Sequence, residues 1–400
     1  MTVYYINLLL ILGLAWPLCI YKPSRVKSGI YLAVNFAYMW FIATFRYGIG
    51  FDYESYIKIF QDIKAAEGFS GLLNQGPELG FTLLTKAMAF FVPNSLVMYG
   101  IYAALILIPI AVFIYLWCDN KWLSTWLFVT LTFFYTSMNF IRQSLACSIV
   151  ALSYGFLRSK KPIPYFAMIL LAATFHKTAL IMIPVYFVCH LKLGKKLGIL
   201  YGSMTVLLYI FSETILQLVT RFVFTYYKDS VYVTAFSPVF LLIPFTIFGA
   251  CLALWPIWQK RDPDSTVLMN LMLYSAIIWL FITRHFILER LSMYVYIFAL
   301  VAAPAALSCL LASPEEYALR DELRQGTDKK PGKEALAKLK KLNQSISDHQ
   351  KYYWSAVVAL VFLTLCYNEF GSHVNGFHNV FPYQSVLDWL GGNGAPTPFN

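Results

Sequence analysis

The sequence predicts an all-α polytopic membrane protein with about twelve transmembrane helices, built as a single integral membrane domain over residues 1–400. Two observations lead to this prediction. Of the residues, 59% are hydrophobic and only 13% are charged, which leaves too little polar surface for a soluble domain. The hydrophobic residues also gather into continuous runs, and about 20 of them are enough to cross a bilayer as a helix.

Apolar runs recur along the chain and are separated by polar segments. Their approximate bounds are 2–21, 28–45, 96–117, 122–137, 141–157, 163–176, 178–190, 197–211, 233–255, 265–282, 291–311 and 353–368. The division of 122–157 and 163–190 into paired helices is open, because these stretches are nearly continuous. A weaker run at 78–92 contains Glu78 and Lys86 and is shorter than a span, which predicts an external interfacial or re-entrant segment.

The amino terminus and the cysteines exclude several other protein classes. No basic residue precedes the first apolar run, which is typical of a membrane span rather than of a signal peptide. The cysteines lie in or beside apolar stretches, and none belongs to a C-x-x-C pair or a Cys/His cluster. We therefore expect no disulfide framework, no metal site and no cofactor.

The basic residues predict the orientation, because cytoplasmic loops carry the excess of Lys and Arg. With alternating spans, one side holds 21 of the 31 basic residues, including a charged connector at 312–352. The other side holds ten, and its C-terminal tail at 369–400 has none. Both termini are therefore expected outside. Anionic lipid then accounts for the net charge of +11 without nucleic-acid binding.

Ionisable residues remain at the predicted outer ends of the spans. They are Arg46, Arg142, His176, Lys177, Arg221, Arg284, His285 and Arg290. Each alone has two interpretations, a snorkelling or headgroup contact and a binding site. Several guanidinium groups on one face favour a site, because the planar fork of Arg grips phosphate oxygens.

The first external loop, FRYGIGFDYESYIKIF, gathers chemistry-bearing residues within a few positions. Arg46 is followed by Asp52, Tyr53 and Tyr56. Asp52 is a candidate general base or sugar-hydroxyl acceptor, and the tyrosines are candidates for stacking on sugar rings. The alternative for Asp52 is the N-cap of an interfacial helix. Glu78, further on, is either a first-turn helix acid or a catalytic carboxylate.

Two apolar runs contain polar interruptions. Arg142 and Gln143 follow MNFI at the outward end of one run, and His176 and Lys177 interrupt LAATFHKTALIM. An intramembrane histidine is commonly a hydrogen-bonded packing element, but the adjacent Lys177 and the predicted outer location favour a catalytic or cavity-lining role for His176.

These blocks, in this order, resemble the EpsG-type branch of the Wzy polysaccharide polymerases. The matching residues are Arg46, Gly50, Asp52, Tyr53 and Tyr56, then Glu78 and Gly80, Arg142 with Gln143, Leu145 and Ala146, Phe175 with His176, Thr178 and Ala179, Glu289 with Arg290 and Tyr294, and Pro382 with Tyr383. The resemblance covers nearly the whole chain, although the 312–352 insert is longer than expected. It implies a GT-C-like membrane glycosyltransferase of the bacterial cytoplasmic membrane.

The activity implied is transfer of a growing glycan from undecaprenyl pyrophosphate onto a lipid-linked repeat at the external leaflet. The catalytic candidates are then Asp52, Glu78, His176 and Glu289. The substrate-binding candidates are Arg46, Tyr53, Tyr56, Arg142, Gln143, Lys177, Arg284, Arg290, Tyr294 and Tyr383. The implied partners are the lipid-linked glycans, membrane lipid and a chain-length regulator. A lipid-linked oligosaccharide flippase and an O-antigen-type ligase remain alternatives.

Overall fold

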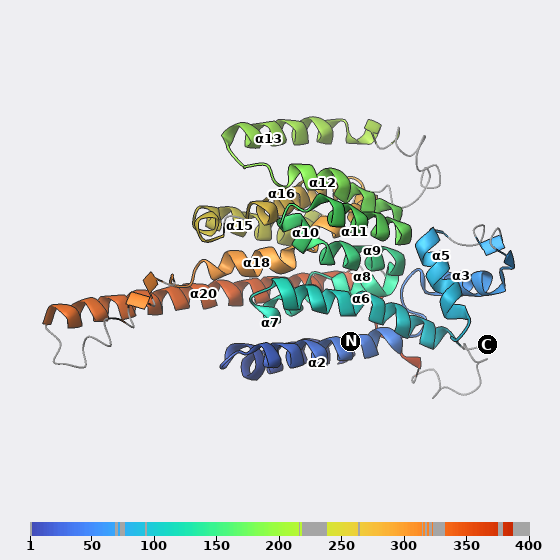
Figure 1. The fold of residues 1–400 in the computed structure, drawn as a ribbon, viewed down its shortest axis with the longest axis horizontal. Helices are drawn as coiled ribbons and strands as arrows, with labels where there is room; N and C mark the ends of the chain where they lie inside the picture. The colour runs from blue at the N-terminus through green and yellow to red at the C-terminus, as the bar shows by residue number, and fades with distance from the viewer. Residues whose placement is uncertain are drawn as a thin grey trace.

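A computed structural model describes residues 2–68, 71–72, 77–92, 94–215, 217, 238–262, 265–313, 315–316, 318–319, 322, 333–374 and 379–386. Within these ranges the regular structure is helical, apart from one isolated bridge between Arg46 and Ser385. The helices form an elongated bundle, with α3 and α5 at one end and the long α20 projecting from the other (Figure 1). This confirms the predicted all-α class.

Six helices are long and apolar enough to cross a membrane. They are α1 (Thr2–Ala15) continued by the π-helical η1 (Trp16–Ile20), α2 (Arg25–Thr44), α6 (Ser95–Trp117), η5 (Pro238–Leu241) continued by α15 (Leu242–Arg261), α16 (Ser265–Ile282), and α20 (Lys333–Val374). A bent pair, α17 (Glu289–Tyr296) and α18 (Ala299–Ser308), makes a seventh if counted as one span. Seven of the predicted apolar runs therefore correspond to these elements.

The other five predicted runs form shorter helices. They are α7 (Lys121–Thr130) and α8 (Phe133–Asn139), α9 (Ile141–Leu152) and α10 (Tyr154–Arg158), α11 (Pro162–Phe175), η2 (Lys177–Ile181) and α12 (Met182–Val188), and α13 (Lys195–Ile210). Thr132 adopts a left-handed conformation (φ 71°) between α7 and α8, which interrupts that run. The total of twelve spans and the GT-C-like arrangement remain predictions.

Side-chain caps explain where several helices begin. The Ser24 hydroxyl accepts a hydrogen bond from Lys27 N at the start of α2, and Asn94 and Asn120 cap α6 and α7 in the same way. Each cap satisfies a backbone N–H that has no partner within the helix. Two short helices, α3 (Tyr53–Ala65) and α5 (Leu79–Ala89), lie across the end of the bundle. The predicted segment at 78–92 thus forms α5, well short of a span.

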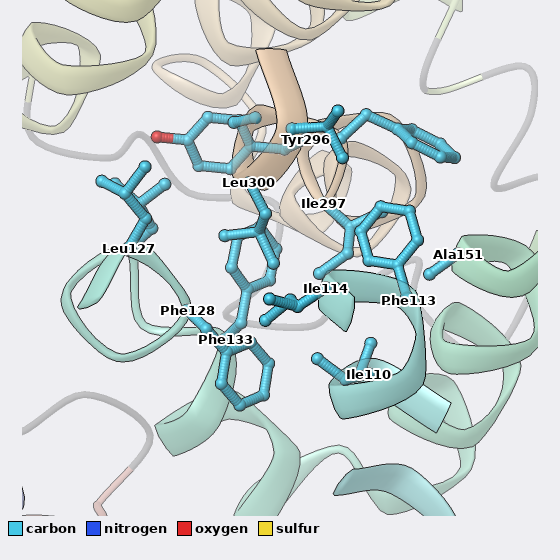
Figure 2. Close-up of a cluster of buried hydrophobic side chains, with 14 of the residues drawn as sticks. Ile110, Phe113, Ile114, Leu127, Phe128, Phe133, Ala151, Tyr296, Ile297 and Leu300 are labelled. Carbon is cyan, nitrogen blue, oxygen red and sulfur yellow. The ribbon is translucent and has the colours of Figure 1, made fainter. Parts of the chain in front are cut away.

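The middle of the bundle is a dry core of aromatic and aliphatic side chains. Figure 2 shows it between α6, α7, α8, α9, α17 and α18, where the labelled residues are Ile110, Phe113, Ile114, Leu127, Phe128, Phe133, Ala151, Tyr296, Ile297 and Leu300. Close packing of this kind resists relative movement of the helices. It therefore holds the starts of α9 and α17 in fixed positions at the α3–α5 end.

The chain termini of the described structure meet at the α3–α5 end. The Tyr4 hydroxyl donates to the carbonyl of Val380 at 3.0 Å, and Val386 N donates to the carbonyl of Phe45 at 2.9 Å. Arg158 contacts Asp262 at 3.2 Å at the opposite end, where α2 and α7 also begin. The basic loops and the termini are thus on opposite ends of the bundle. The 312–352 connector does not stay separate, because α20 starts within it at Lys333.

Orientation in the membrane is tested by labelling single cysteines in intact cells, after the native cysteines have been replaced by serine. We expect Phe51→Cys, exposed at the α3–α5 end, to react with a membrane-impermeant maleimide. Lys340→Cys, exposed on the projecting part of α20, should react only after the cells are permeabilised. The opposite pattern would reverse the orientation that the charge distribution predicts.

Candidate functional site

Three charged or ionisable side chains meet at the α3–α5 end. Glu78 Oε2 accepts a hydrogen bond from Arg142 Nη1, and Glu78 Oε1 lies 3.1 Å from His176 Nδ1. The backbone N–H of Arg142 donates to the Tyr56 hydroxyl at 3.3 Å. Glu78, Arg142, His176 and Tyr56 are called the Glu78 cluster below. All four were predicted as site residues from the sequence.

Breaks between helices bring these residues together. Glu78 is the N-cap of α5 and has an extended backbone (φ −135°, ψ 147°). His176 is the C-cap of α11 and is also extended (φ −157°, ψ 116°), so the apolar stretch 163–190 divides at this residue. Arg142 lies in the first turn of α9. Each residue therefore stands at a helix terminus, where the chain turns at the same end of the bundle.

The Glu78 cluster is shielded from solvent. The side chains of Glu78, His176 and Arg142 are 8%, 13% and 26% exposed. Burial of a carboxylate is costly, and pairing with a cation offsets the cost. Burial acts to raise the pKa of Glu78, but the His176 hydrogen bond and the Arg142 charge outweigh it, so the pKa lies below its ordinary value. Glu78 is therefore an anion held between two nitrogen donors.

Two nitrogen atoms of the cluster have no hydrogen-bond partner among the residues that the structure describes. They are Arg142 Nε and His176 Nε2, both buried. A buried nitrogen without a partner is able to form a hydrogen bond with water or with a bound ligand. The contact of Nδ1 with the Glu78 carboxylate favours the tautomer that carries its proton on Nδ1. In this tautomer His176 Nε2 has a free lone pair and can accept a proton.

The lowered pKa of Glu78 makes a testable prediction about stability. A carboxyl whose pKa falls on folding stabilises the fold above its ordinary pKa, here 4.5, and this stabilisation is lost as the pH falls through the lowered value. We expect Glu78→Gln to reduce the free energy of unfolding by about 1.5–3 kcal/mol at neutral pH. Denaturant unfolding in detergent should show this difference shrinking below about pH 4.5. A difference that does not depend on pH would contradict the ion pair.

A second predicted group packs beside the first turn of α9. Gln143 Nε2 donates to the backbone carbonyl of Arg290 at 2.5 Å, which ties α9 to α17. The Arg290 guanidinium lies 4.9 Å from the centroid of the Phe140 ring. On the next turn of α17, the Tyr294 hydroxyl contacts the Thr178 hydroxyl at 3.1 Å. Arg142 and Arg290 thus project from facing helices.

Arg46 is placed differently from the other predicted arginines. It is 2% exposed, and its guanidinium donates to the backbone carbonyls of Ala43 and Met138. The guanidinium carbon lies 4.2 Å from the centroid of the Tyr99 ring and 6.0 Å from that of the Tyr53 ring. Its backbone pairs with Ser385. Two donor nitrogens of Arg46, Nη1 and Nη2, are therefore engaged by the scaffold, which organises the loop between α2 and α3. Its buried Nε has no hydrogen-bond partner among the described residues.

The C-terminal segment 379–386 holds the same loop in place. Gly50 has a positive φ of 99° and donates its backbone N–H to the Asn379 carbonyl at 2.8 Å. Tyr47 N donates to the Gln384 carbonyl at 3.0 Å, and the predicted site residue Tyr383 donates its hydroxyl to the Ile42 carbonyl at 3.0 Å. Tyr383 thus contacts the end of α2. The partner of this hydrogen bond, Ile42, lies in α2 just before the loop and does not belong to the Glu78 cluster.

Asp52 stands at the N-cap position of α3, as the alternative interpretation of the sequence expected. Its side chain makes no capping hydrogen bond, however, and its backbone N–H donates to Asn139 Oδ1 at 2.9 Å. Tyr56, one turn further along α3, has its hydroxyl in the Glu78 cluster. Asp52 therefore lies beside the cluster along α3, and its carboxylate interacts electrostatically with Tyr56.

The remaining predicted residues are dispersed. Lys177 is exposed at the start of η2 beside His176. Glu289 is buried at the start of α17, where it interacts electrostatically with Tyr367. Arg284 stacks on the Tyr209 ring at 4.2 Å and donates to the Tyr209 carbonyl at 2.8 Å, so it contacts the α13 side of the bundle. Arg221 lies outside the described residues.

Two residues that support the site were not predicted. Asn139 orients the backbone of Asp52, and Tyr99 stacks on Arg46 and on Tyr53 at 4.7 Å. Asn139 interrupts an apolar run three residues before Arg142, which was an available signal. Tyr99 had no such signal, because it is one of 28 tyrosines and lies within an apolar run.

Comparison with known proteins gives one family and no individual relative. The model of the EpsG family matches residues 29–318, which contain every residue of the Glu78 cluster. No curated protein and no solved structure matches the chain. The matched region ends before Pro382 and Tyr383, so the last block of the resemblance lies outside it. Because the match spans well over half of the 400 residues, the chain belongs to the EpsG family of polymerase-type membrane proteins of polysaccharide biosynthesis.

Proposed function

We propose that the protein is a polymerase that transfers a growing glycan from undecaprenyl pyrophosphate onto a lipid-linked repeat unit at the external face of the bacterial cytoplasmic membrane. The observation that carries the proposal is the Glu78 cluster. It combines a fixed cation, a carboxylate-bound histidine and two unpartnered buried nitrogens at one end of a membrane bundle. Family membership supports the polysaccharide context.

The reaction needs an acceptor base and stabilisation of a leaving group. A hydroxyl oxygen of the acceptor sugar forms a bond to the anomeric carbon of the donor sugar. The bond from that carbon to the pyrophosphate oxygen breaks, and its electron pair leaves with the lipid pyrophosphate. The acceptor proton passes to His176 Nε2, while Glu78 holds the imidazole through Nδ1 and stabilises the imidazolium.

Arginines stabilise the negative charge that develops on the pyrophosphate. Arg142 retains Nε and further donors beyond the nitrogen that contacts Glu78, and Arg290 projects from the facing helix. Guanidinium groups bind phosphate oxygens through two parallel hydrogen bonds. Fixed cations in a partly dry site act on charge that appears only in the transition state. This assigns leaving-group binding to Arg142 and Arg290.

The other predicted residues receive supporting roles in the proposal. Lys177 and Arg284 are outlying cations for the glycan or its phosphates, and Tyr53, Tyr56 and Tyr294 form the walls and hydroxyl contacts of the site. Gln143 positions Arg290, and Arg46 and Tyr383 order the loop that carries Asp52. Asp52 and Glu289 are alternative bases. The 3.1 Å contact between Glu78 Oε1 and His176 Nδ1 favours His176 with Glu78 for that role.

A flippase and an O-antigen-type ligase are the competing functions. A flippase requires ionisable residues along a path through the membrane. The Glu78 cluster lies instead at one end of the bundle, which favours surface chemistry. A ligase would need a similar arginine site and differs in its acceptor.

Purified protein in lipid vesicles tests the proposal directly. Given undecaprenyl-pyrophosphate-linked repeat units as the only glycan, a polymerase should produce a ladder of lipid-linked polymers on a gel. A ligase would leave single repeats unchanged until its own acceptor is added. A flippase would move the repeats between leaflets without lengthening them. Absence of a ladder with both active-site arginines intact would count against the polymerase.

A further inference from the structure

The start of α5 and the end of α11 approach each other more closely than side chains allow. A Cβ atom added at Gly80 would lie 2.2 Å from Thr174 Oγ1, 2.7 Å from Thr174 Cβ and 3.0 Å from the Thr174 carbonyl oxygen. Two of these three atoms belong to the base of the side chain or to the backbone. Rotation of the Thr174 side chain therefore cannot make room for a methyl group.

The contact between Gly80 and Thr174 lies two residues along the chain from each member of the Glu78–His176 pair. Glu78 precedes Gly80 by two residues, and His176 follows Thr174 by two residues. Glu78 Oε1 and His176 Nδ1 are 3.1 Å apart. Glu78 stands at the start of α5 and His176 at the end of α11, the same two helices that touch at Gly80 and Thr174. Any increase in the separation of α5 and α11 at Gly80 lengthens this distance. The Thr174 hydroxyl is itself fixed by donation to the Leu171 carbonyl at 2.7 Å.

We infer that Gly80 and Thr174 are positioning residues, which set the distance between Glu78 and His176 through a glycine-dependent helix contact. The inference rests on the proposed roles of Glu78 and His176 in catalysis. The structural part of the inference, that Gly80 controls the Glu78–His176 contact, can be tested without any substrate. A displacement of about 1 Å at a reacting group is enough to reduce turnover about 100-fold.

Helical glycines elsewhere provide matched controls. For Gly202 in α13 and Gly249 in α15, an added Cβ meets no described atom within 4 Å outside the chain neighbours and the backbone of the same helix. Alanine at either position should be tolerated, because it fills open space and favours the helix. Gly80→Ala differs from these only in what the new methyl group meets.

The experiment compares three Gly80 variants of the full chain with a Glu78 variant and with the Gly202→Ala and Gly249→Ala controls, in a measurement that needs no turnover. Diethyl pyrocarbonate modification of His176 is followed by mass spectrometry in Gly80→Ala, Gly80→Ala/Thr174→Gly and Gly80→Ala/Thr174→Ser. We expect Gly80→Ala to increase the modification rate at least threefold, matching Glu78→Ala, because the imidazole is then no longer held at Nδ1 and its buried Nε2 becomes accessible to the reagent. Thr174→Gly removes Oγ1 and Cβ and should restore the slow rate, whereas Thr174→Ser keeps both atoms and should not.

Polymer synthesis by the same variants supplies the second measurement. Gly80→Ala should lower kcat about 100-fold with KM nearly unchanged, and Thr174→Gly should recover at least tenfold of this loss. A modification rate in Gly80→Ala equal to that of the unaltered protein would overturn the inference, as would equal rescue by Thr174→Gly and Thr174→Ser. If the labelling follows the expected order but the unaltered protein makes no polymer, the positioning inference stands and the proposed function fails.

Discussion

Arg142→Lys should reduce polymer synthesis about 100-fold while the protein remains folded in the membrane. Lysine keeps the positive charge, so its ammonium group can still pair with Glu78 and the buried carboxylate keeps a counter-ion. It has only one nitrogen, however. Arginine can contact Glu78 through Nη1 and direct its unpartnered Nε and second terminal nitrogen toward a phosphate. The loss should therefore appear in turnover of lipid-linked repeats.

Arg158→Lys is the matched control for this substitution. Arg158 also pairs with a carboxylate, Asp262 at 3.2 Å, but it lies at the basic end of the bundle and both side chains are about one-third exposed. An exposed pair of this kind contributes little, on the order of 0.2–1 kcal/mol. We expect Arg158→Lys to keep near-normal polymer synthesis and membrane level. Full activity in Arg142→Lys would remove Arg142 from leaving-group binding.

Much of the bundle could be predicted because the bilayer imposes a strong pattern on the sequence. The runs at 28–45, 96–117 and 265–282 reappear as α2, α6 and α16 within a few residues. Prediction was weakest where one apolar stretch contains two short helices. At Thr132 and His176 the backbone leaves the helix, and hydropathy does not detect such a change because the flanking residues stay apolar.

The Glu78 cluster could be predicted as a set of residues but not as a set of contacts. Glu78, Arg142 and His176 were visible as polar exceptions at the ends of apolar runs. Their pairing depends on how α5 crosses α11 and α9, which no spacing along the chain encodes. Arg46 shows the reverse case. It has the same sequence signal as Arg142, yet two of its guanidinium nitrogens donate to the backbone carbonyls of Ala43 and Met138, and the group lies over the Tyr99 ring.

Exchange of His176 for asparagine separates the packing role of this residue from its proposed role as base. An asparagine side-chain N–H can replace the Nδ1 hydrogen bond to Glu78, so the ion pair of Glu78 and Arg142 and the fold should persist. The substitution removes Nε2, the atom with a free lone pair. General base catalysis contributes about 10²–10⁴-fold, and we expect His176→Asn to lower kcat within this range with little change in KM.

A matched histidine variant then tests whether this loss is specific to the proposed base. His349→Asn is the control, since His349 is a partly exposed histidine at the basic end with its Nδ1 near the Leu310 carbonyl. If His176→Asn retains near-normal turnover, His176 is a packing residue. Asp52→Asn and Glu289→Gln then become the decisive substitutions, because an amide keeps the shape of a carboxylate but cannot accept the acceptor's proton.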